Sequence, residues 1–419
     1  MKKALCGMIA LLVCVSAAGC AKNMGEVQTV TCLAEPEVTY VSEPVSSYHE
    51  IGEVSGYFDY ALLKETAGDE NFVISPMSVK LALNMAAMGA KEETEKELLT
   101  LFGYENSEQM RENSKSLVSE LDRADGSITV NNSVWIDSDF QDISESYTGG
   151  LADIFNAVTF REKLTDKKIV PTLNGWIDEK TNGLIPDMIS EPFQEDTVML
   201  LVNALYFKNE WVHEFEPNFN MVFHGVNGDS ETESMTDEGK HIYYGEGSVF
   251  RSVRFSYKDD SYMNVYLPKS EDGDVLEIIG RLTPEELAKA MDILYSNGME
   301  TDRSVRVVMP KFECEYRESL KETLQKLGIF YSFEAGFADF GGMLTDNSEE
   351  TLCISDVIHA AKLECNEKGT EAAAVTIEVF DGCAIEENPP IDFIVDKPFI
   401  YEIKAPSGET LFMGIICGF

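Results

Sequence analysis

Hydrophobic residues recur at helical spacing in the first part of the chain. A first helix is predicted by four of them: Val54, Phe58, Ala61 and Leu62. A second helix is predicted to begin at Pro76, because Ser75 suits the N-cap and proline suits the first helical position. Leucine and methionine continue this second pattern up to Gly89, where the helix is expected to end.

Strand-like patterns replace the helical ones farther along the chain. Apolar and β-branched residues run or alternate in four regions: Ser127 to Ile136, Val198 to Phe207, Tyr243 to Tyr266 and Ser304 to Cys314. The last quarter of the chain is mostly of this kind. Helices come first and strands later, without βαβ alternation or an internal repeat. This order predicts an α+β fold in which helices pack around large, mostly antiparallel sheets.

The N-terminus has a separate character. Met1 and two lysines precede an apolar run from Ala4 to Val15, and small residues then lead to Cys20, which is typical of an export signal. These small residues resemble a bacterial lipobox, in which the cysteine is lipidated and becomes the mature N-terminus, although Ala17 replaces the larger aliphatic residue usual there. Ordinary signal cleavage, or retention of the segment, stays open. The run is shorter than the roughly 20 residues that span a membrane.

We therefore assign residues 1–20 to a signal peptide of the lipoprotein type and expect an exported protein, either a cell-envelope lipoprotein or extracellular. Contact with a membrane is expected only through a lipid on Cys20. Residues 21–47 are rich in Thr, Val, Glu, Pro and Ser without helical period, which suits a flexible tether. No linker composition follows, so residues 48–419 are predicted to form one domain.

The composition excludes several classes of partner. The net charge of −41 over 419 residues argues against nucleic acid, whose phosphates require basic patches, and solubility explains the acidity more simply than a cationic partner. The chain has nine cysteines but no CxxC motif and no Cys/His cluster. Cys365 and Cys417 stand in apolar, strand-like contexts, where a free cysteine behaves as a small buried hydrophobe. We expect mostly free thiols, although an exported protein could pair some of them.

Motifs for catalysis are missing from the sequence. There is no Gly-x-Ser-x-Gly elbow, no His-Glu-x-x-His and no phosphate-binding glycine loop. The five histidines lack paired metal-ligand spacing. Pairs of Asp and Glu could mimic acid/base dyads, but in so acidic a chain such pairs are expected on a solvated face. We predict no catalytic residue, metal or cofactor.

The segment from Glu367 to Thr376 joins a glycine to a run of small side chains and leads into a loop. Its compact residues could slide between two existing strands, and glycine leaves the backbone free to swing where the run begins. The residues concerned are Gly369, Thr370, Ala372, Ala373, Ala374 and Thr376. The segment is therefore suited to becoming a strand.

This segment resembles the proximal hinge of the serpin family, and the resemblance extends from about residue 48 to the end of the chain. Seven further segments are similar to serpin segments in the family order: Asn71–Ser78, Thr172–Trp176 with Thr181–Gly183, Asn203–Trp211, Met309–Phe312, Ser355–His359, Lys397–Phe399 and Leu411–Gly414. Any one of these strings is weak, but their joint order is specific. The resemblance implies the serpin fold with an exposed reactive-centre loop near the C-terminus.

The resemblance also implies a polar cluster where the central sheet opens. The residues assigned to it are Asn71, Ser75, Ser78, Asn203, Trp211 and His359. Hydroxyl, amide and imidazole groups buried there need partners, so such a cluster can hold the closed sheet and pair again once a strand has entered. His359 is structural on this reading, as it would be as an ordinary core histidine, and Trp211 is expected to be a packing anchor.

By the same resemblance, the bond cut by a target protease follows the seventeenth residue counted from Glu367, which places it between Cys383 and Ala384. Cys383 would then be the specificity residue and would suit the small primary pocket of an elastase-like or subtilisin-like serine protease, or of a papain-like cysteine protease. Loop length varies, so cleavage after Gly382 or Ala384 stays open, and Cys383 could also be an unimportant surface thiol.

Glu378, which follows the run of alanines, is unfavourable for insertion of the loop into a sheet. If Thr370, Ala372, Ala374 and Thr376 point inward after insertion, Glu378 does so too, and burying an unpaired carboxylate is costly. Slow insertion would favour hydrolysis of the loop over trapping of the protease.

The resemblance implies an irreversible suicide-substrate inhibitor that is metastable and monomeric: the protease cuts the loop, and the loop enters the central sheet as a strand while the acylated protease is distorted. A non-inhibitory carrier or chaperone-like protein of the same fold is the alternative. Such proteins are expected to have bulky or charged hinge residues, and this hinge has none beyond the glutamate also usual in inhibitors.

Overall fold

The computed structural model describes residues 58–121, 127–246, 249–270, 275, 303–370 and 389–419, and the backbone of strands β1 (Cys6–Ala17) and β2 (Cys32–Ala34). The chain divides into two compact units, each built from separate stretches. The first comprises Met1–Phe58, Ser75–Phe207 and Tyr316–Lys362, and the second Asp59–Ile74, Lys208–Glu315 and Leu363–Phe419.

Helix α2 of the first unit begins where the sequence predicts. Ser75 caps α2, since its Oγ accepts a hydrogen bond from the Ser78 N–H at 3.2 Å, Pro76 is the first helical residue, and the helix ends just before Gly89. Residues 58–66 are also helical, although from Asp59 onward they belong to the second unit. The elements of the first unit are α2 (Pro76–Ala87), α3 (Glu92–Leu101), α4 (Ser107–Leu121), α5 (Glu145–Phe155), α6 (Ile169–Lys180), α9 (Lys321–Lys326), η1 (Tyr331–Phe333) and η2 (Gly341–Met343).

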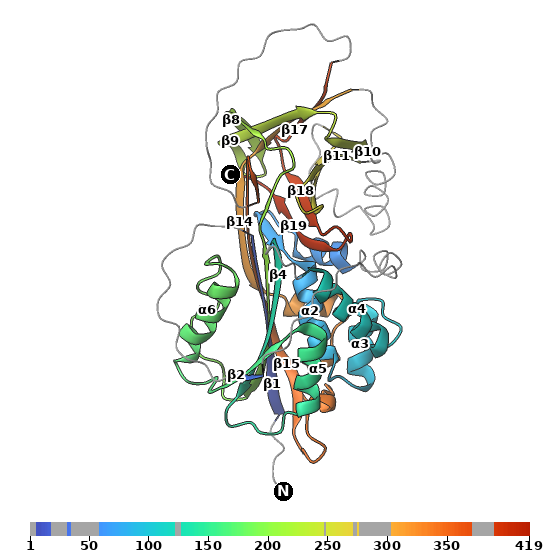
Figure 1. Cartoon of the computed structure of the whole chain (residues 1–419), viewed down its shortest axis with the longest axis vertical. Coiled ribbons are helices and arrows are strands. Elements are labelled where there is room, and N and C mark those ends of the chain that lie inside the picture. The colour runs from blue at the N-terminus through green and yellow to red at the C-terminus, as the bar shows by residue number, and fades with distance from the viewer. Residues whose placement is uncertain are drawn as a thin grey trace. The chain divides into compact units, whose positions relative to one another are not determined.

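The sheet of the first unit has helices on both faces. Its strands follow the order β2-β5-β4-β6-β1-β15, and β14 also pairs with β15. Figure 1 shows α2 to α5 on one side of these strands and α6 on the other. The remaining strand bounds are β4 (Ile128–Asp137), β5 (Val158–Glu162), β6 (Thr197–Phe207), β14 (Phe312–Ser319) and β15 (Thr351–Asn366).

Because both faces are covered, every residue of β6 is buried. Leu200, Val202 and Ala204 pack with Leu173 and Trp176 against α6. Successive side chains of a strand point to opposite faces, so Leu201 and Asn203 lie on the α2 face. Ala360 belongs to the α6 cluster, which places its neighbour His359 on the α2 face as well.

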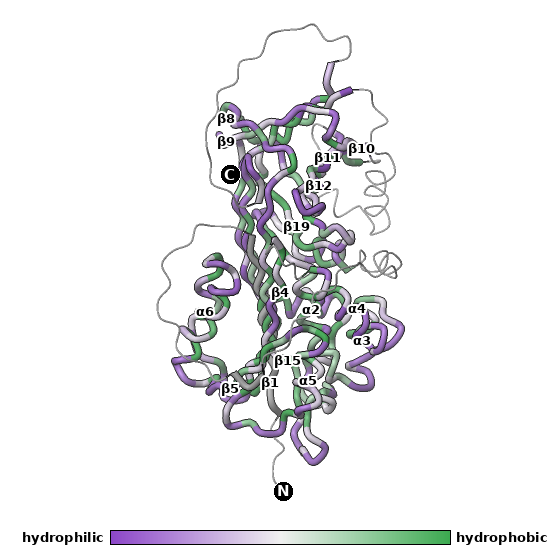
Figure 2. Tube along the Cα trace, viewed as in Figure 1, coloured by the Kyte–Doolittle hydropathy of each residue, from purple (hydrophilic) through white to green (hydrophobic). Residues whose placement is uncertain are grey.

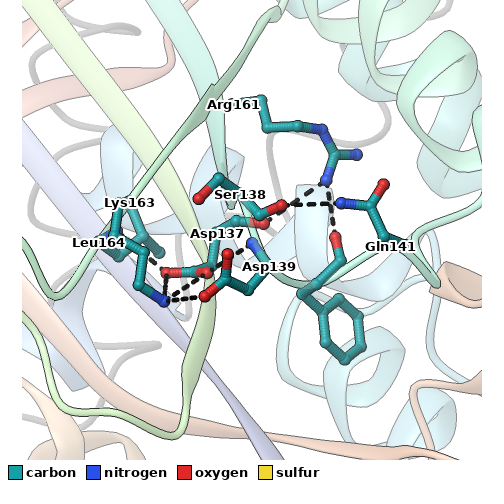
Figure 3. Close-up of polar contacts among 8 residues, drawn as sticks. Asp137, Ser138, Asp139, Gln141, Arg161, Lys163 and Leu164 are labelled. Atoms are coloured by element: carbon teal, nitrogen blue, oxygen red, sulfur yellow. Dashed lines mark hydrogen bonds and ion pairs between the residues drawn. The ribbon is translucent and has the colours of Figure 1, made fainter.

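A cluster of hydrogen bonds and ion pairs joins the ends of β4 and β5 (Figure 3). Asp137 is buried, and its carboxylate accepts hydrogen bonds from the Leu164 and Asp139 N–H groups at 3.0 and 2.9 Å. Lys163 bridges Asp137 and Asp139 at 3.0 and 2.9 Å. The neighbouring Arg161 donates to the Phe140 carbonyl at 2.7 Å. The contacts of Asp137 and Asp139 thus fix the turn that leads toward α6.

The second unit contains two sheets. One has the strand order β10-β11-β12-β18-β19-β3 and the other β17-β13-β9-β8, and their pairs are antiparallel except for β13 with β17. The bounds of these strands are β3 (Phe72–Ile74), β8 (Glu216–Gly225), β9 (Gly228–Gly239), β10 (Tyr243–Glu246), β11 (Phe250–Ser256), β12 (Tyr262–Pro268), β13 (Val305–Pro310), β17 (Ile391–Ile394), β18 (Phe399–Lys404) and β19 (Thr410–Ile416). The two short strands β16 (Gly369–Thr370) and β7 (Asn209–Glu210) belong to neither of these sheets and follow β15 in the order of the main sheet.

The predicted α+β class is therefore confirmed, with one change. The single strand expected from Ser304 to Cys314 is two strands, because β13 pairs within a sheet of the second unit whereas β14 pairs with β15. Lys311 lies between them, and its N–H bonds the Glu233 carbonyl at 2.9 Å. Figure 2 shows the long hydrophobic stretches in strands such as β19, whereas α3 and α4 carry more hydrophilic residues.

A buried ion pair interrupts the apolar core of the second unit. Lys404 Nζ lies 3.1 Å from Glu402 Oε1, and both side chains are at least nine-tenths buried. The Tyr60 and Tyr266 hydroxyls each donate to the Glu402 carboxylate at 3.1 Å, and the Asn264 amide donates at 3.2 Å. A buried charge is tolerated when it is paired and hydrogen-bonded in this way.

Four of the cysteines are described, and all are buried free thiols, as expected: Cys314, Cys353, Cys365 and Cys417. Burial raises the pKa of Cys314 to about 12 and raises that of Cys365 still further.

Candidate functional site

The start of the predicted hinge is already a short strand. In β16, Thr370 lies opposite Cys365 and Gly369 opposite Asn366, both antiparallel to β15. The other edge of β16 pairs with β7, where Gly369 faces Glu210 and Thr370 faces Asn209. The chain thus turns back at Glu367 and Lys368 and begins to run alongside β15.

Trp211 holds this turn. Its N–H donates to the Lys368 carbonyl at 2.8 Å, and its indole Nε1 donates to the Asn366 carbonyl at 3.0 Å. The ring is buried and stacks on Tyr257, with centroids 4.2 Å apart and an angle of 15° between planes. The Phe215 N–H adds a hydrogen bond of 2.7 Å to the Glu367 carbonyl. Trp211 is therefore a packing anchor of the hinge.

The first two hinge residues are fixed by their surroundings. Gly369 has a φ of +154°, and a Cβ there would lie 2.1 Å from the Asn209 carbonyl oxygen, so no larger residue fits. Thr370 is fully buried, and its hydroxyl lies 2.7 Å from the Tyr257 hydroxyl. Burial holds the pKa of Tyr257 well above its ordinary value, so this phenol stays a neutral hydrogen-bonding group.

An ion pair fixes the hinge glutamate. Lys311 Nζ lies 3.2 Å from Glu367 Oε1 and also contacts the Glu233 carboxylate. Burial by itself would lower the pKa of Lys311, but its hydrogen bonds to the two carboxylates outweigh this and raise the pKa. Lys311 is therefore charged and joins two acidic residues that would otherwise repel each other.

Three residues of the predicted polar cluster meet in the first unit. The Ser75 N–H donates to Nε2 of His359 at 3.2 Å, and Ser75 Oγ accepts from the Ser78 N–H. All three residues are fully buried. Burial lowers the pKa of His359 to about 3, so the imidazole is neutral, and its proton lies on Nδ1 because Nε2 accepts. His359 Nδ1 and Ser78 Oγ have no hydrogen-bond partner.

Asn203 lies on the neighbouring part of this face. Its amide Nδ2 donates to Asn132 Oδ1 at 2.8 Å, and Asn132 in turn donates to the Phe155 carbonyl at 2.7 Å. The remaining oxygen of the Asn203 amide, Oδ1, is buried without a partner. A buried polar atom left unpaired costs about 1–3 kcal/mol. The α2 face thus presents an unpaired donor on His359 and an unpaired acceptor on Asn203.

Other predicted site residues lie elsewhere. Asn71 belongs to the second unit, where its Oδ1 accepts from the Cys417 and Gly418 N–H groups at 2.6 and 3.1 Å. Part of the hinge (Ala372, Ala373, Ala374, Thr376), the reactive bond (Cys383, Ala384) and Cys20 lie outside the described residues.

Several partners of the hinge were not predicted from the sequence. Tyr257 contacts Thr370 and Glu233 pairs with Lys311, and both lie outside the recognised motifs, so no local pattern could identify them. Asn209 stands in a recognised segment, but its pairing with Thr370 joins residues far apart in the chain. Lys311 stands in a recognised motif, but its pairing with Glu367 joins residues far apart in the chain. Asn132 gave no distinct signal, because its neighbours Asn131 and Ser133 are polar too.

The described residues contain neither a metal-binding cluster nor a membrane-spanning helix. No group of three or more His, Cys, Asp or Glu side chains among them could hold a metal ion. Within the same residues, no helix has the length and apolar character to span a membrane.

Known proteins resemble this chain over most of its length. A family model described as serpin (serine protease inhibitor) matches residues 57–418. Antithrombin-III of Homo sapiens is 31% identical over 383 residues, which cover 85% of this chain and 78% of that protein. The native state of tengpin, a thermophilic serpin, has a TM-score of 0.78 at 25% identity and covers 94% of this chain and 100% of its own. A complex of thyroxine-binding globulin with thyroxine has a TM-score of 0.73 at 22% identity, covering 88% and 99%. The chain therefore belongs to the serpin family.

Proposed function

We propose that this protein is a suicide-substrate inhibitor of a serine protease, or of a papain-like cysteine protease, that accepts a small residue at the cleavage site. Serpins are generally protease inhibitors, and this chain matches the family over residues 57–418. The proposed reactive bond joins Cys383 to Ala384. The observation that supports insertion of the cut loop is the pairing of β16.

The register of β16 can be extended along the strands that it touches. Thr370 faces Cys365, so in an antiparallel pair the residue six positions after Thr370 faces the residue six positions before Cys365. This places Thr376 opposite His359. The same count from the pair of Thr370 with Asn209 places Thr376 opposite Asn203 on the other edge. The pairings on the two edges therefore converge on His359 and Asn203, each of which carries an unpaired polar atom.

A threonine hydroxyl satisfies both of these atoms. It can accept a hydrogen bond from His359 Nδ1 and donate one to Asn203 Oδ1, since a hydroxyl carries one donor and two lone pairs. Directly opposite residues of an antiparallel pair point to the same face, which here is the α2 face. Insertion of the loop to Thr376 would thus relieve two buried polar groups and add strand hydrogen bonds.

The chemistry before insertion belongs to the protease. Its serine or cysteine nucleophile attacks the carbonyl carbon of Cys383, an ester or thioester bond forms, and the bond to the Ala384 nitrogen breaks as that amine takes up a proton. The loop is then free at its new end. In the proposed mechanism, insertion follows before water can hydrolyse the acyl-enzyme, and the protease stays attached.

A panel of proteases tests this function. The protein is mixed with elastase-like, subtilisin-like, chymotrypsin-like, trypsin-like and papain-like enzymes, and a denaturant-resistant complex is expected with those that have a small primary pocket. Mass spectrometry of the released C-terminal peptide identifies the bond, and a peptide beginning at Ala384 is expected. Cleavage by every enzyme without a stable complex would reject the inhibitor function and favour a carrier.

We also propose that the protein is exported and held at the cell envelope by lipid on Cys20. The support is the N-terminal sequence. Metabolic labelling with a fatty acid should mark the unaltered protein and leave a Cys20→Ser variant unmarked. Labelling of both, or of neither, would contradict the lipid anchor.

A further inference from the structure

The first apolar segment of the chain occupies a place in the main sheet. Strand β1 (Cys6–Ala17) lies between β6 and β15 in the strand order of the first unit. It runs parallel to β6, and the paired positions extend from Met8 with Thr197 to Ser16 with Tyr206. The segment that the sequence assigns to export is thus also an interior strand.

We propose that the position between β6 and β15 is a strand-binding site whose occupant in the unprocessed chain is residues 6–17, and that this occupancy blocks protease trapping until the segment is removed. The proposal rests on the proposed function, because trapping requires the loop to enter the same sheet. It concerns only the form of the protein that retains its N-terminus.

The composition of residues 6–17 fits an interior strand. An interior strand of a sheet covered on both faces must be almost continuously apolar, as β6 is, with every residue buried. Residues 6–17 contain no charged residue and include several β-branched or aliphatic ones. A short apolar run suits a buried strand as well as an export signal. The same twelve residues therefore satisfy both requirements.

Occupancy by β1 and by the loop exclude each other. A strand has two hydrogen-bonding edges, and β6 already uses one for β4 and the other for β1. The loop register places Thr376 against Asn203, but Val13 of β1 is paired with Asn203 in this structure. The loop therefore cannot pair with β6 while β1 remains.

The residue opposite Asn203 also differs between the two occupants: it is Val13 when β1 is bound and Thr376 when the loop is inserted. Valine has no side-chain group that can donate or accept a hydrogen bond, whereas threonine has a hydroxyl. Asn203 Oδ1 and His359 Nδ1 are unpaired in the structure that contains β1. The site thus holds the N-terminal strand through its backbone pairing with β6, with two polar groups left unsatisfied. The loop, whose Thr376 hydroxyl can pair with both groups, could therefore replace β1.

Hydrogen exchange on the full chain tests the occupancy without any protease. The protein is made without export, so that residues 1–20 are retained, and amide exchange is followed by mass spectrometry. Peptides covering residues 8–16 should exchange at least about 100-fold more slowly than a synthetic peptide of residues 1–20, because paired interior amides exchange only on opening. Exchange at the rate of the free peptide would overturn the proposal.

A proline variant and a matched control link occupancy to trapping. Val13→Pro removes an N–H inside β1 and is not tolerated in an interior strand, whereas Ala18→Pro makes the same change just beyond it. Val13→Pro should abolish protection of residues 8–16 and form the covalent complex at least about tenfold faster than the full chain, and Ala18→Pro should do neither. Equal exchange and equal trapping in the two variants would refute the proposal.

The two readouts separate this proposal from the inhibitor function. If residues 8–16 are protected, the protection is lost in Val13→Pro, and no variant traps any protease, then the strand assignment stands and the inhibitor function fails. If the full chain and Val13→Pro both form the covalent complex with a protease, and do so at the same rate, blockage by β1 is rejected.

Discussion

Replacing Glu378 by alanine should make the protein a more efficient trap. The register that places Thr376 opposite His359 and Asn203 places Glu378 two residues farther on, opposite Val357 and Leu201. Both of these side chains are fully buried, with 0% exposure. An inserted loop would therefore bring a carboxyl group into an apolar part of the α2 face.

The cost can be estimated from the ordinary pKa of glutamate. At pH 7 the group is about 2.7 pH units above its usual pKa of roughly 4.3, so neutralising it costs about 3.7 kcal/mol, at roughly 1.36 kcal/mol per unit. A neutral carboxyl that finds no hydrogen-bond partner there costs about 1–3 kcal/mol more. The total of about 5–7 kcal/mol opposes a step that must outrun hydrolysis of the acyl-enzyme.

The assay is a titration of protease with inhibitor, which gives the number of inhibitor molecules consumed for each protease trapped. Glu378→Ala should bring this number close to one. Glu378→Gln, which has no charge but keeps a polar group, should give a number between those of the alanine variant and the unaltered protein. For the unaltered protein, lowering the pH from 8 to 6 reduces the neutralisation cost by about 2.7 kcal/mol and should lower the number. The alanine variant should show little of this pH dependence.

Equal numbers for all three proteins would refute this reasoning. They would mean either that insertion stops before residue 378 or that the register of β16 does not continue. The length of chain protected from proteolysis after cleavage distinguishes these two explanations.

Four other changes have defined outcomes. Thr376→Val should destabilise the cleaved, inserted form by about 1–3 kcal/mol for each polar group left unpaired, measured by chemical denaturation, whereas Thr376→Ser should retain most of the stability. Thr370→Arg should convert inhibitor to substrate, because Thr370 is fully buried against Tyr257, and unchanged trapping would contradict insertion. His359 has an unfolded-state pKa of 6.5 and a folded-state pKa of about 3, so the unfolded state binds more protons between these values and stability falls as the pH drops below 6.5. Between pH 6.5 and 5 the protein should lose about 1.6 kcal/mol of unfolding free energy relative to His359→Gln, and parallel pH profiles would exclude a neutral buried histidine. Lys404→Met should cost about 3–5 kcal/mol in urea unfolding, because it leaves the Glu402 carboxylate buried without its cation, and Glu402→Gln in the same background should recover part of the loss.

The sequence predicts much of the fold because local signals act within a few residues. Ser75 and Pro76 mark the start of α2, and the buried β6 follows a continuous apolar run. The sequence does not predict that the strand divides into β13 and β14 at Lys311, because the choice of partner sheet depends on strands far away in the chain. Apolar periodicity gives the type of element but not its neighbour in a sheet.

The candidate site divides in the same way. The hinge is visible because glycine and small side chains cluster in sequence, and the family resemblance marks Trp211 as an anchor, but the other partners carry no such signal. Tyr257 and Lys311 reach Thr370 and Glu367 across separations of more than 50 residues. The interior role of residues 6–17 was equally hidden, because one apolar composition serves both export and burial.

The buried free thiols make the described fold indifferent to redox conditions. No disulfide joins Cys314, Cys353, Cys365 and Cys417, so folding of these parts requires no oxidation. With a pKa of about 12, Cys314 is a thiolate in only about one molecule in 100,000 at pH 7, against a few per cent for an ordinary cysteine. The thiolate is the form that reacts with oxidants and disulfides. The described part of the domain can therefore keep one covalent structure in both reducing and oxidising surroundings.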